Sequence, residues 1–208
     1  LSALENDVIN PKKLIHCKGS VELYGQKYHC WKDKGHGYMN LRSAIKQSCD
    51  IYFYEVARRL GVDRLSITAK DFGLGQAVLD NFNEEKVGIV PNTKWKLKNI
   101  GKNWLLGETL ISGIGQGYYL STPIQLCLMT AQLANGGHEI YPKIVVNEKD
   151  EKFEEIKALM KKRSKDHKND KGGLIEATEG ILSIAKNKRY KTLYENFDNL
   201  KIIREAMF

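Results

Sequence analysis

Three cysteines and one histidine in the first quarter of the chain restrict how that part can fold. Cys17, Cys30, His36 and Cys49 follow one another at intervals of 13, 6 and 13 residues. Three thiolates and an imidazole are a ligand set suited to tetrahedral zinc, although these intervals are longer and looser than those of a zinc finger. His29 could supply the imidazole in place of His36. A zinc ion held in this way would tie the first two cysteines to the segment around Cys49.

Two other states of these thiols remain open. A disulfide between Cys17 and Cys30 is chemically reasonable if the domain faces an oxidising compartment. The remaining alternative is a set of buried thiols without any link. Cys127 follows Pro123 in a segment of helical pattern, and we expect it to be a small core residue rather than a ligand.

Length and composition indicate a globular chain. With 208 residues, of which 42% are hydrophobic, it can bury one substantial core or two small ones. No apolar run approaches the roughly eighteen residues of a membrane span, and the first residues lack the pattern of a signal peptide.

The net charge is +8, and much of it lies in the run "KKRSKDHKNDK" at 161–171. We interpret this run as a solvated linker, with a patch for anionic lipid or acidic polymer as the alternative. Nucleic acid is disfavoured because no aromatic residues interleave with these lysines.

Helical patterns with clear boundaries occupy two parts of the chain. Between 41 and 60 the apolar spacing predicts a helix pair or one broken helix, with the joint at 48–50, Asn40 as the N-cap and Gly61 as the stop. A third helix is predicted between Thr122, its cap, and the "NGG" that follows Ala134. Its inward positions are expected to be Leu126, Met129, Leu133 and Ala134.

The remaining segments are less regular. Residues 150–163 and roughly 174–207 have patterns of further helices, whereas 74–118, rich in Gly, Pro and Asn, is expected to form loops and short strands. Both ends carry apolar positions typical of a buried helix face. We therefore expect the chain to be an internal part of a longer domain.

Five segments resemble a known family. In order along the chain they are "GHG" (35–37), "SCDIYFYEVARRLGVDRL" (48–65), "FGLGQ" (72–76), "GETLISGIGQGYYLSTPIQL" (107–126) and "LANGG" (133–137). Together they resemble the class B penicillin-binding proteins, and within these the penicillin-binding protein 2 family. The resemblance covers residues 1–145, and 146–208 is expected to be a helical insertion or tail. It implies a mixed α/β fold, mainly the helical lobe of a β-lactamase-like serine transpeptidase domain.

Three motifs carry the family's reaction: S-x-x-K, S-x-N and K-[ST]-G. Only the middle one is recognisable, as Ser48, Cys49 and Asp50, with aspartate where most of the superfamily has asparagine. By resemblance, Ser48 relays a proton and Asp50 helps to hold the stem peptide. The literal S-x-x-K matches beginning at Ser43 and Ser183 are rejected, the first because it lies in the same helical segment as Ser48 and the second because it lies in the unmatched tail.

The resemblance also implies a setting and partners. Some members of the family place a zinc site beside the active site, and "GHG" favours His36 over His29. The complete protein is expected to cross-link peptidoglycan stem peptides through an acyl-serine and to be an antibiotic target of β-lactams. It would work with membrane proteins of cell elongation at the periplasmic face of the bacterial inner membrane. The span alone is expected to be inactive.

Two further interpretations concern the turn at 113–118 and the chain as a whole. The turn "GIGQGY" at 113–118 lacks the following Lys-[Ser/Thr] of a phosphate loop, so we interpret it as a tight turn near the cleft, with Gln116 as a weak candidate for substrate contact. A competing hypothesis for the whole chain is a noncatalytic binding module stapled by zinc.

Overall fold

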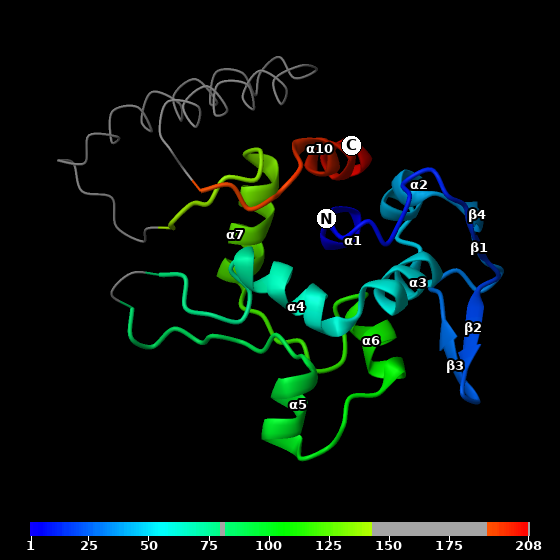
Figure 1. Ribbon diagram of the computed structural model, residues 1–208, viewed down its shortest axis with the longest axis horizontal. Coiled ribbons are helices and arrows are strands. Elements are labelled where there is room, and N and C mark those ends of the chain that lie inside the picture. Colours follow the sequence, from blue (N-terminus) through cyan, green and yellow to red (C-terminus); the bar gives the residue numbers. More distant parts are fainter. Residues whose placement is uncertain (80–81, 143–190, 208) are drawn as a thin grey trace.

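Helices predominate in the computed structural model, which describes residues 1–79, 82–142 and 191–207 (Figure 1). The strands are short and form two separate antiparallel pairs at one end of the molecule. The helices are α1 (Ser2–Glu5), α2 (Leu41–Lys46), α3 (Asp50–Leu60), α4 (Val62–Asp71), α5 (Thr93–Ile100), α6 (Leu106–Ser112), α7 (Pro123–Ala134) and α10 (Phe197–Met207). This is the mixed α/β fold, mainly helical, that was predicted.

The strands lie within and beside the cysteine loop, residues 17–36. In the first pair, β1 (Ile15–Cys17) runs antiparallel to β4 (Gly37–Met39), with Cys17 opposite Gly37. Between them β2 (Ser20–Leu23) and β3 (Gln26–His29) form a hairpin. Two residues turn this hairpin, and both have positive φ, as a type I′ turn requires.

The helix pair predicted between 41 and 60 is confirmed as α2 and α3. The Asn40 side chain accepts a hydrogen bond from the Ser43 N–H at 2.9 Å, and this caps α2. Gly61, with φ 81°, ends α3 and directly begins α4, a helix that was not predicted from the sequence. Only glycine adopts such a φ without strain, so the chain changes direction there.

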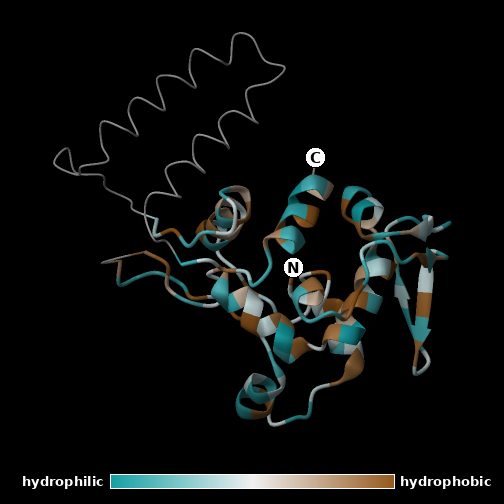
Figure 2. Ribbon diagram, turned by 45° about the horizontal axis from the view of Figure 1, so that its top comes forward, coloured by the Kyte–Doolittle hydropathy of each residue, from teal (hydrophilic) through white to brown (hydrophobic). Residues whose placement is uncertain are grey.

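The main core lies around α3. Buried residues of α1, α2, α3, α6 and the first strand pair form one cluster, with Tyr52 only 1% exposed. Apolar and hydrophilic stretches alternate along these helices (Figure 2), as expected when one face of each is buried. The end of α6 comes so close to α3 that a Cβ on Gly113 would collide with that of Ala57. The packing thus fixes the direction of α3, which begins at the serine–aspartate motif.

Helix α7 has its predicted boundaries but not its predicted inner face. Thr122 caps it, Pro123 is its first residue, and Asn135 is its C-cap. The buried side chains are instead Gln125, Leu128 and Gln132. All other residues of α7 are partly or fully exposed. The side-chain amides of these glutamines donate hydrogen bonds to the backbone carbonyls of Gln76, Val87 and Phe72.

Two predictions for α7 were therefore wrong. Leu126 is 45% exposed, and Cys127 is exposed rather than a core residue. The helix turns its glutamines inward because the loops beside it present carbonyl groups that need donors. The apolar pattern alone predicts that the opposite face of α7 is the buried one.

The expectation of loops and strands over 74–118 was also wrong in part, because this stretch contains α5 and α6. The Asn92 side chain accepts from the Trp95 N–H at 2.7 Å and caps α5. Burial of Lys96 beside Glu108 then joins the two helices. Lysine and glutamate give no apolar period, so the sequence pattern missed both helices.

Several predictions concern the C-terminal part of the chain, from residue 150 onward. The helix predicted at 150–163, the basic run at 161–171 and Ser183 lie outside the described residues. Within the described part of 174–207, only α10 is helical; residues 191–196 are not, and Thr192 forms a β-bridge with His138. Helix α10 packs on α2 and buries Leu200. In the described ranges, no helix combines the length and apolar character needed to cross a membrane.

Candidate metal centre and serine–aspartate turn

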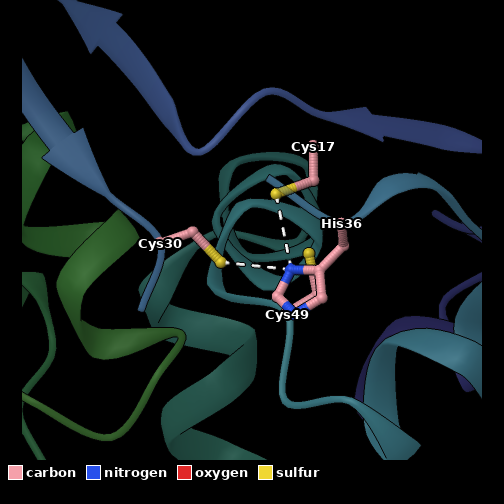
Figure 3. A group of neighbouring side chains, drawn as sticks. All are labelled: Cys17, Cys30, His36 and Cys49. Atoms are coloured by element: carbon pink, nitrogen blue, oxygen red, sulfur yellow. Dashed lines mark hydrogen bonds between the residues drawn. The ribbon is translucent and has the colours of Figure 1, made fainter. Parts of the chain in front are cut away.

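Four residues from separate elements meet at one end of α3 (Figure 3). Cys17 ends β1, Cys30 follows β3, His36 precedes β4, and Cys49 is the N-cap of α3. One potential ligand atom from each residue lies within 4.8 Å of all the others. These are the four residues that the sequence analysis proposed as zinc ligands.

The distances within the cluster suit a shared cation. The Nδ1 atom of His36 lies 3.6 Å from the Cys17 sulfur and 3.4 Å from the Cys30 sulfur. Zinc–sulfur bonds of about 2.3 Å and zinc–nitrogen bonds of about 2.0 Å, in tetrahedral geometry, separate such ligand atoms by roughly 3.5 Å. The three cysteines are 0–2% exposed, and all are free thiols. The donor set therefore fits zinc.

Two glycines let the cysteine loop close on itself. A Cβ on Gly35 would collide with the backbone carbonyl of Cys17, and one on Gly19 would collide with that of Asp33. Both glycines have positive φ. A backbone hydrogen bond from Cys30 N–H to Gly19 O, at 2.8 Å, then fixes the end of the hairpin. The sequence thus brings Cys17 and Cys30 together through backbone contacts that other residues could not make.

The thiols of Cys17 and Cys49 have different electrostatic environments. Burial acts to raise the pKa of Cys17, but hydrogen bonds from the backbone of His36 and Gly19 and from neighbouring thiols leave that pKa lower than usual. Burial, as the largest cause, and negative charge on Cys17 and Cys30 together raise the pKa of Cys49 to about 12. Three thiolates so close together repel one another, so a divalent cation would be needed to hold all of them deprotonated.

His36 has one ring nitrogen inside the cluster and one outside it. The Nε2 atom is buried and has no hydrogen-bond partner among the described residues. The Trp31 ring packs edge-on against this imidazole, with 5.2 Å between ring centroids. If Nδ1 ligates a metal, the proton of the neutral ring must be on Nε2. His29, the alternative, is exposed at the end of β3 and lies outside the cluster.

The serine–aspartate motif is a sharp turn between α2 and α3. Ser48 has φ 50°, a left-handed conformation that is uncommon for a residue other than glycine. The turn is closed by hydrogen bonds from Cys49 N–H to Ala44 O at 3.0 Å and from Ser48 N–H to Ile45 O at 3.2 Å. The Cys49 thiol points toward Cys17, Cys30 and His36, with which it forms the candidate metal cluster (Figure 3), while Ser48 and Asp50 flank it along the chain.

Trp31 also contacts this turn. Its backbone N–H donates to Asp50 Oδ2 at 2.9 Å, and its indole N–H donates to the carbonyls of Gln47 and Ser48. Sequence analysis missed Trp31 because a single tryptophan in a loop has no pattern. The only available signal was its position directly after Cys30.

The other candidates lie apart from these contacts. Gln116 is exposed on the turn after α6, and no hydrogen bond in the described ranges connects it to Ser48 or to the cluster. The flanking Gly115 and Gly117 have positive φ, so the predicted tight turn is present. Ser43 is engaged in capping α2 through Asn40, which is a structural role.

Comparison with known proteins identifies the class. The family model described as penicillin binding protein transpeptidase domain matches residues 1–190. The chain therefore belongs to the penicillin-binding protein transpeptidase family, as its motifs predicted. The match passes beyond residue 145 without testing the boundary expected there.

Individual relatives narrow the class further. The chain is 37% identical over 150 residues to peptidoglycan D,D-transpeptidase MrdA of Salmonella typhimurium, covering 71% of this chain and 24% of that protein. With MrdA of Acinetobacter baumannii the identity is 39% over 147 residues, which covers 70% of this chain and 22% of that protein. The chain thus spans about a quarter of the length of these curated relatives.

Solved structures agree with this placement. Penicillin-binding protein 2 (PBP2) of Pseudomonas aeruginosa has a TM-score of 0.66 and 44% identity, covering 68% of this chain and 33% of that one. PBP2 of Helicobacter pylori, in a complex with MreC, has a TM-score of 0.74 and 29% identity over 99% of this chain and 32% of that one. The resemblance to the penicillin-binding protein 2 family is therefore confirmed.

Proposed function

We propose that this chain is part of a peptidoglycan D,D-transpeptidase that cross-links stem peptides through an acyl-serine. The observation that carries the proposal is the Ser48–Cys49–Asp50 turn, which occupies the joint between α2 and α3 and resembles the family's middle motif in its residues. Relatives named as D,D-transpeptidases support the reaction class. The nucleophilic serine and its lysine would come from an S-x-x-K motif, for which residues 1–208 offer no suitable match.

Ser48 and Asp50 would have distinct roles. The Ser48 hydroxyl would relay a proton between the lysine of S-x-x-K and the leaving amine, which requires that the turn hold it in one place. Asp50 can only accept hydrogen bonds while ionised, and its Oδ2 already accepts from the Trp31 N–H. Oδ1 is then the oxygen left for the stem peptide. Gln116 is a candidate for substrate contact.

Zinc is proposed as a structural cofactor. Cys17, Cys30, His36 and Cys49 would hold it, and the metal would supply a cross-link between the cysteine loop and the serine–aspartate turn. The spacing and burial of the free thiols support this cofactor over a Cys17–Cys30 disulfide. Cys127, exposed on α7, would take no part.

Location and partners are inferred from relatives. The H. pylori neighbour was solved as a complex between PBP2 and MreC. We infer a comparable elongation-complex membrane protein as a partner of the whole protein at the periplasmic face of the inner membrane. β-Lactams, as analogues of the stem peptide, would acylate the whole protein and make it an antibiotic target.

A labelling experiment tests this function. The 208-residue chain should remain unlabelled by a fluorescent penicillin, because no residue in it is proposed as the acylated nucleophile. The complete protein should be labelled, and Ser48→Ala should slow labelling by roughly 100-fold or more, within the range of general acid–base catalysis. Ser121→Ala, an exposed serine, is the control. Stoichiometric labelling of Ser43 or Ser48 in the short chain would refute the assignment, and a complete protein that binds zinc without labelling would support a noncatalytic module instead.

A further inference from the structure

Trp31 makes more contacts with the serine–aspartate turn than its exposure suggests. It is 64% exposed, so packing in the core does not hold its ring. We propose that Trp31 is a positioning residue, which holds the Ser48–Asp50 turn in its left-handed conformation and couples that turn to the metal cluster. The proposal deepens the transpeptidase function proposed above and, for its effect on acylation, rests on it.

Three hydrogen bonds connect Trp31 to the turn. The indole Nε1–H donates to Ser48 O at 2.8 Å and to Gln47 O at 3.1 Å, so one donor bridges two successive carbonyls. The backbone N–H donates to Asp50 Oδ2 at 2.9 Å. A single residue thus contacts the residue before the motif, its serine and its aspartate.

The indole N–H donates to two carbonyls of the turn, at the end of α2 and at the left-handed Ser48. Carbonyls at the end of a helix lack intrahelical partners, and Gln47 is the C-cap of α2. Ser48, with φ 50°, is in a conformation that persists in an L-residue only when its surroundings favour it. The indole N–H satisfies both carbonyls in that conformation. Its removal should therefore loosen the turn.

Trp31 also belongs to the cysteine loop. It directly follows Cys30, and its ring packs against His36 at 5.2 Å between centroids. A movement of Cys30 or His36 would therefore carry the indole with it. Cys49 connects the cluster to the turn through the chain, whereas Trp31 connects them across the loop. The serine is thus held from two sides.

The first test uses the 208-residue chain loaded with zinc. Trp31→Phe keeps an aromatic ring and removes the N–H, and replacement of Trp31 by its benzothiophene analogue removes the N–H with almost no change of shape. Trp95→Phe is the matched control, since Trp95 packs on Tyr118 in another part of the molecule. We expect amide hydrogen exchange at Cys49 to accelerate about tenfold in both Trp31 variants, the factor that corresponds to one typical hydrogen bond. Exchange in α4, and the zinc content, should be unchanged.

The second test uses the complete protein and separates binding from reaction. In Trp31→Phe we expect the acylation rate constant for a β-lactam to fall ten- to a hundredfold while the dissociation constant of the initial complex stays within twofold, because a small misplacement reduces the rate of a positioned reaction. Trp95→Phe should alter neither constant. A residue with a merely structural role would change the folded fraction and leave the rate constant of the folded enzyme intact.

The outcomes distinguish the two proposals. Unchanged exchange at Cys49 in both Trp31 variants would overturn the positioning role whatever the enzyme does. Accelerated exchange together with normal acylation would overturn the coupling to reaction, provided that Ser48→Ala impairs acylation. If Ser48→Ala is also fully active, the transpeptidase assignment of the turn fails, while the exchange result still decides whether Trp31 holds it.

Discussion

The metal cluster and the α5–α6 pair both bury ionisable side chains, but they balance charge in different ways. The cluster gathers three thiols and an imidazole, which repel one another when the thiols ionise. Between α5 and α6, Lys96 donates to Glu108 and to the Asn103 carbonyl beneath the rings of Trp104 and Tyr118. The second region is neutral by itself, whereas the first would be completed by a cation from solution.

Because of this difference, the stability of the two regions should depend on different conditions. A cluster that shares one ion responds to metal concentration and links elements far apart in sequence, from β1 to α3. An internal ion pair responds to the loss of either partner and stabilises only its own neighbourhood. The turn that carries Ser48 is attached to the first region. We therefore expect metal to influence the proposed active site more than the α5–α6 pair does.

The largest expected effect is loss of the metal. Cys17→Ser should abolish stoichiometric zinc binding, because one of four ligands is lost and ligation is coupled to local folding. Without bound zinc, the chain should lose about 4 kcal/mol of apparent stability relative to zinc at roughly 1,000 times its dissociation constant. Elemental analysis and thermal unfolding with and without a chelator measure both quantities.

Cys127→Ser is the matched control for this substitution, since Cys127 is exposed on α7. It should bind one zinc per chain and unfold as the parent does. A parent chain that contains no zinc and a Cys17–Cys30 disulfide by mass spectrometry would contradict the comparison, because the cluster would then be closed by a covalent bond.

The next effect concerns the ion pair. Lys96 is 3% exposed, so Lys96→Met should leave Glu108 without its cation and destabilise the chain by about 3 kcal/mol. Lys98→Met, at an exposed position of the same helix, should change stability by less than about 0.5 kcal/mol. The double variant Lys96→Met/Glu108→Leu should recover much of the loss, because no unpaired charge remains. Denaturant unfolding tests all three, and equal effects for Lys96 and Lys98 would remove the distinction between the regions.

The two regions also differ in how far sequence could predict them. Cysteine and histidine are rare, and their ligand chemistry makes even loose spacing informative, so all four members of the cluster could be named. Lys96 and Glu108 resemble surface residues in a chain with 33 lysines and arginines, and only packing reveals their burial. The same reason explains α7, where Gln125 and Gln132 turn inward to loop carbonyls. Trp31 contacts the turn through its indole and backbone N–H groups, and a sequence pattern does not record such contacts.

A smaller effect separates stability from function at the turn itself. Ser48→Gly should stabilise the chain by about 0.5–1 kcal/mol, because glycine adopts φ 50° without the strain of a side chain. In the complete protein the same change should impair acylation as strongly as Ser48→Ala does, since the hydroxyl is lost. Ser43→Gly, inside α2 and part of its cap, should instead destabilise the chain. Unfolding curves of the two glycine variants give the comparison, and destabilisation by Ser48→Gly would show that the Ser48 side chain contributes more to the turn than its strain removes.

The smallest expected effect is the response of each region to acid. Burial acts to raise the pKa of Glu108, but hydrogen bonds from Lys96 and the Leu105 N–H leave that pKa below its usual value. Its stabilising contribution is then fully present above the unfolded pKa of about 4.5 and is lost as pH falls through the lower folded pKa. Zinc should be released at a higher pH, because protons compete with the metal for thiolate and imidazole ligands before they reach a carboxylate paired with lysine.

A pH titration can observe both regions in one sample. Acidification should first release zinc, detected with a chromogenic chelator, while the Trp104 and Tyr118 surroundings of Lys96 keep their near-ultraviolet circular dichroism. Below the unfolded pKa of glutamate, the stability difference between the parent and Lys96→Met/Glu108→Leu should shrink, since protonated Glu108 no longer pairs with Lys96. Cys17→Ser should lack the first step and keep the second. If the aromatic signal changed together with zinc release, the two regions would be one cooperative unit, and the difference in charge balance would not separate their responses.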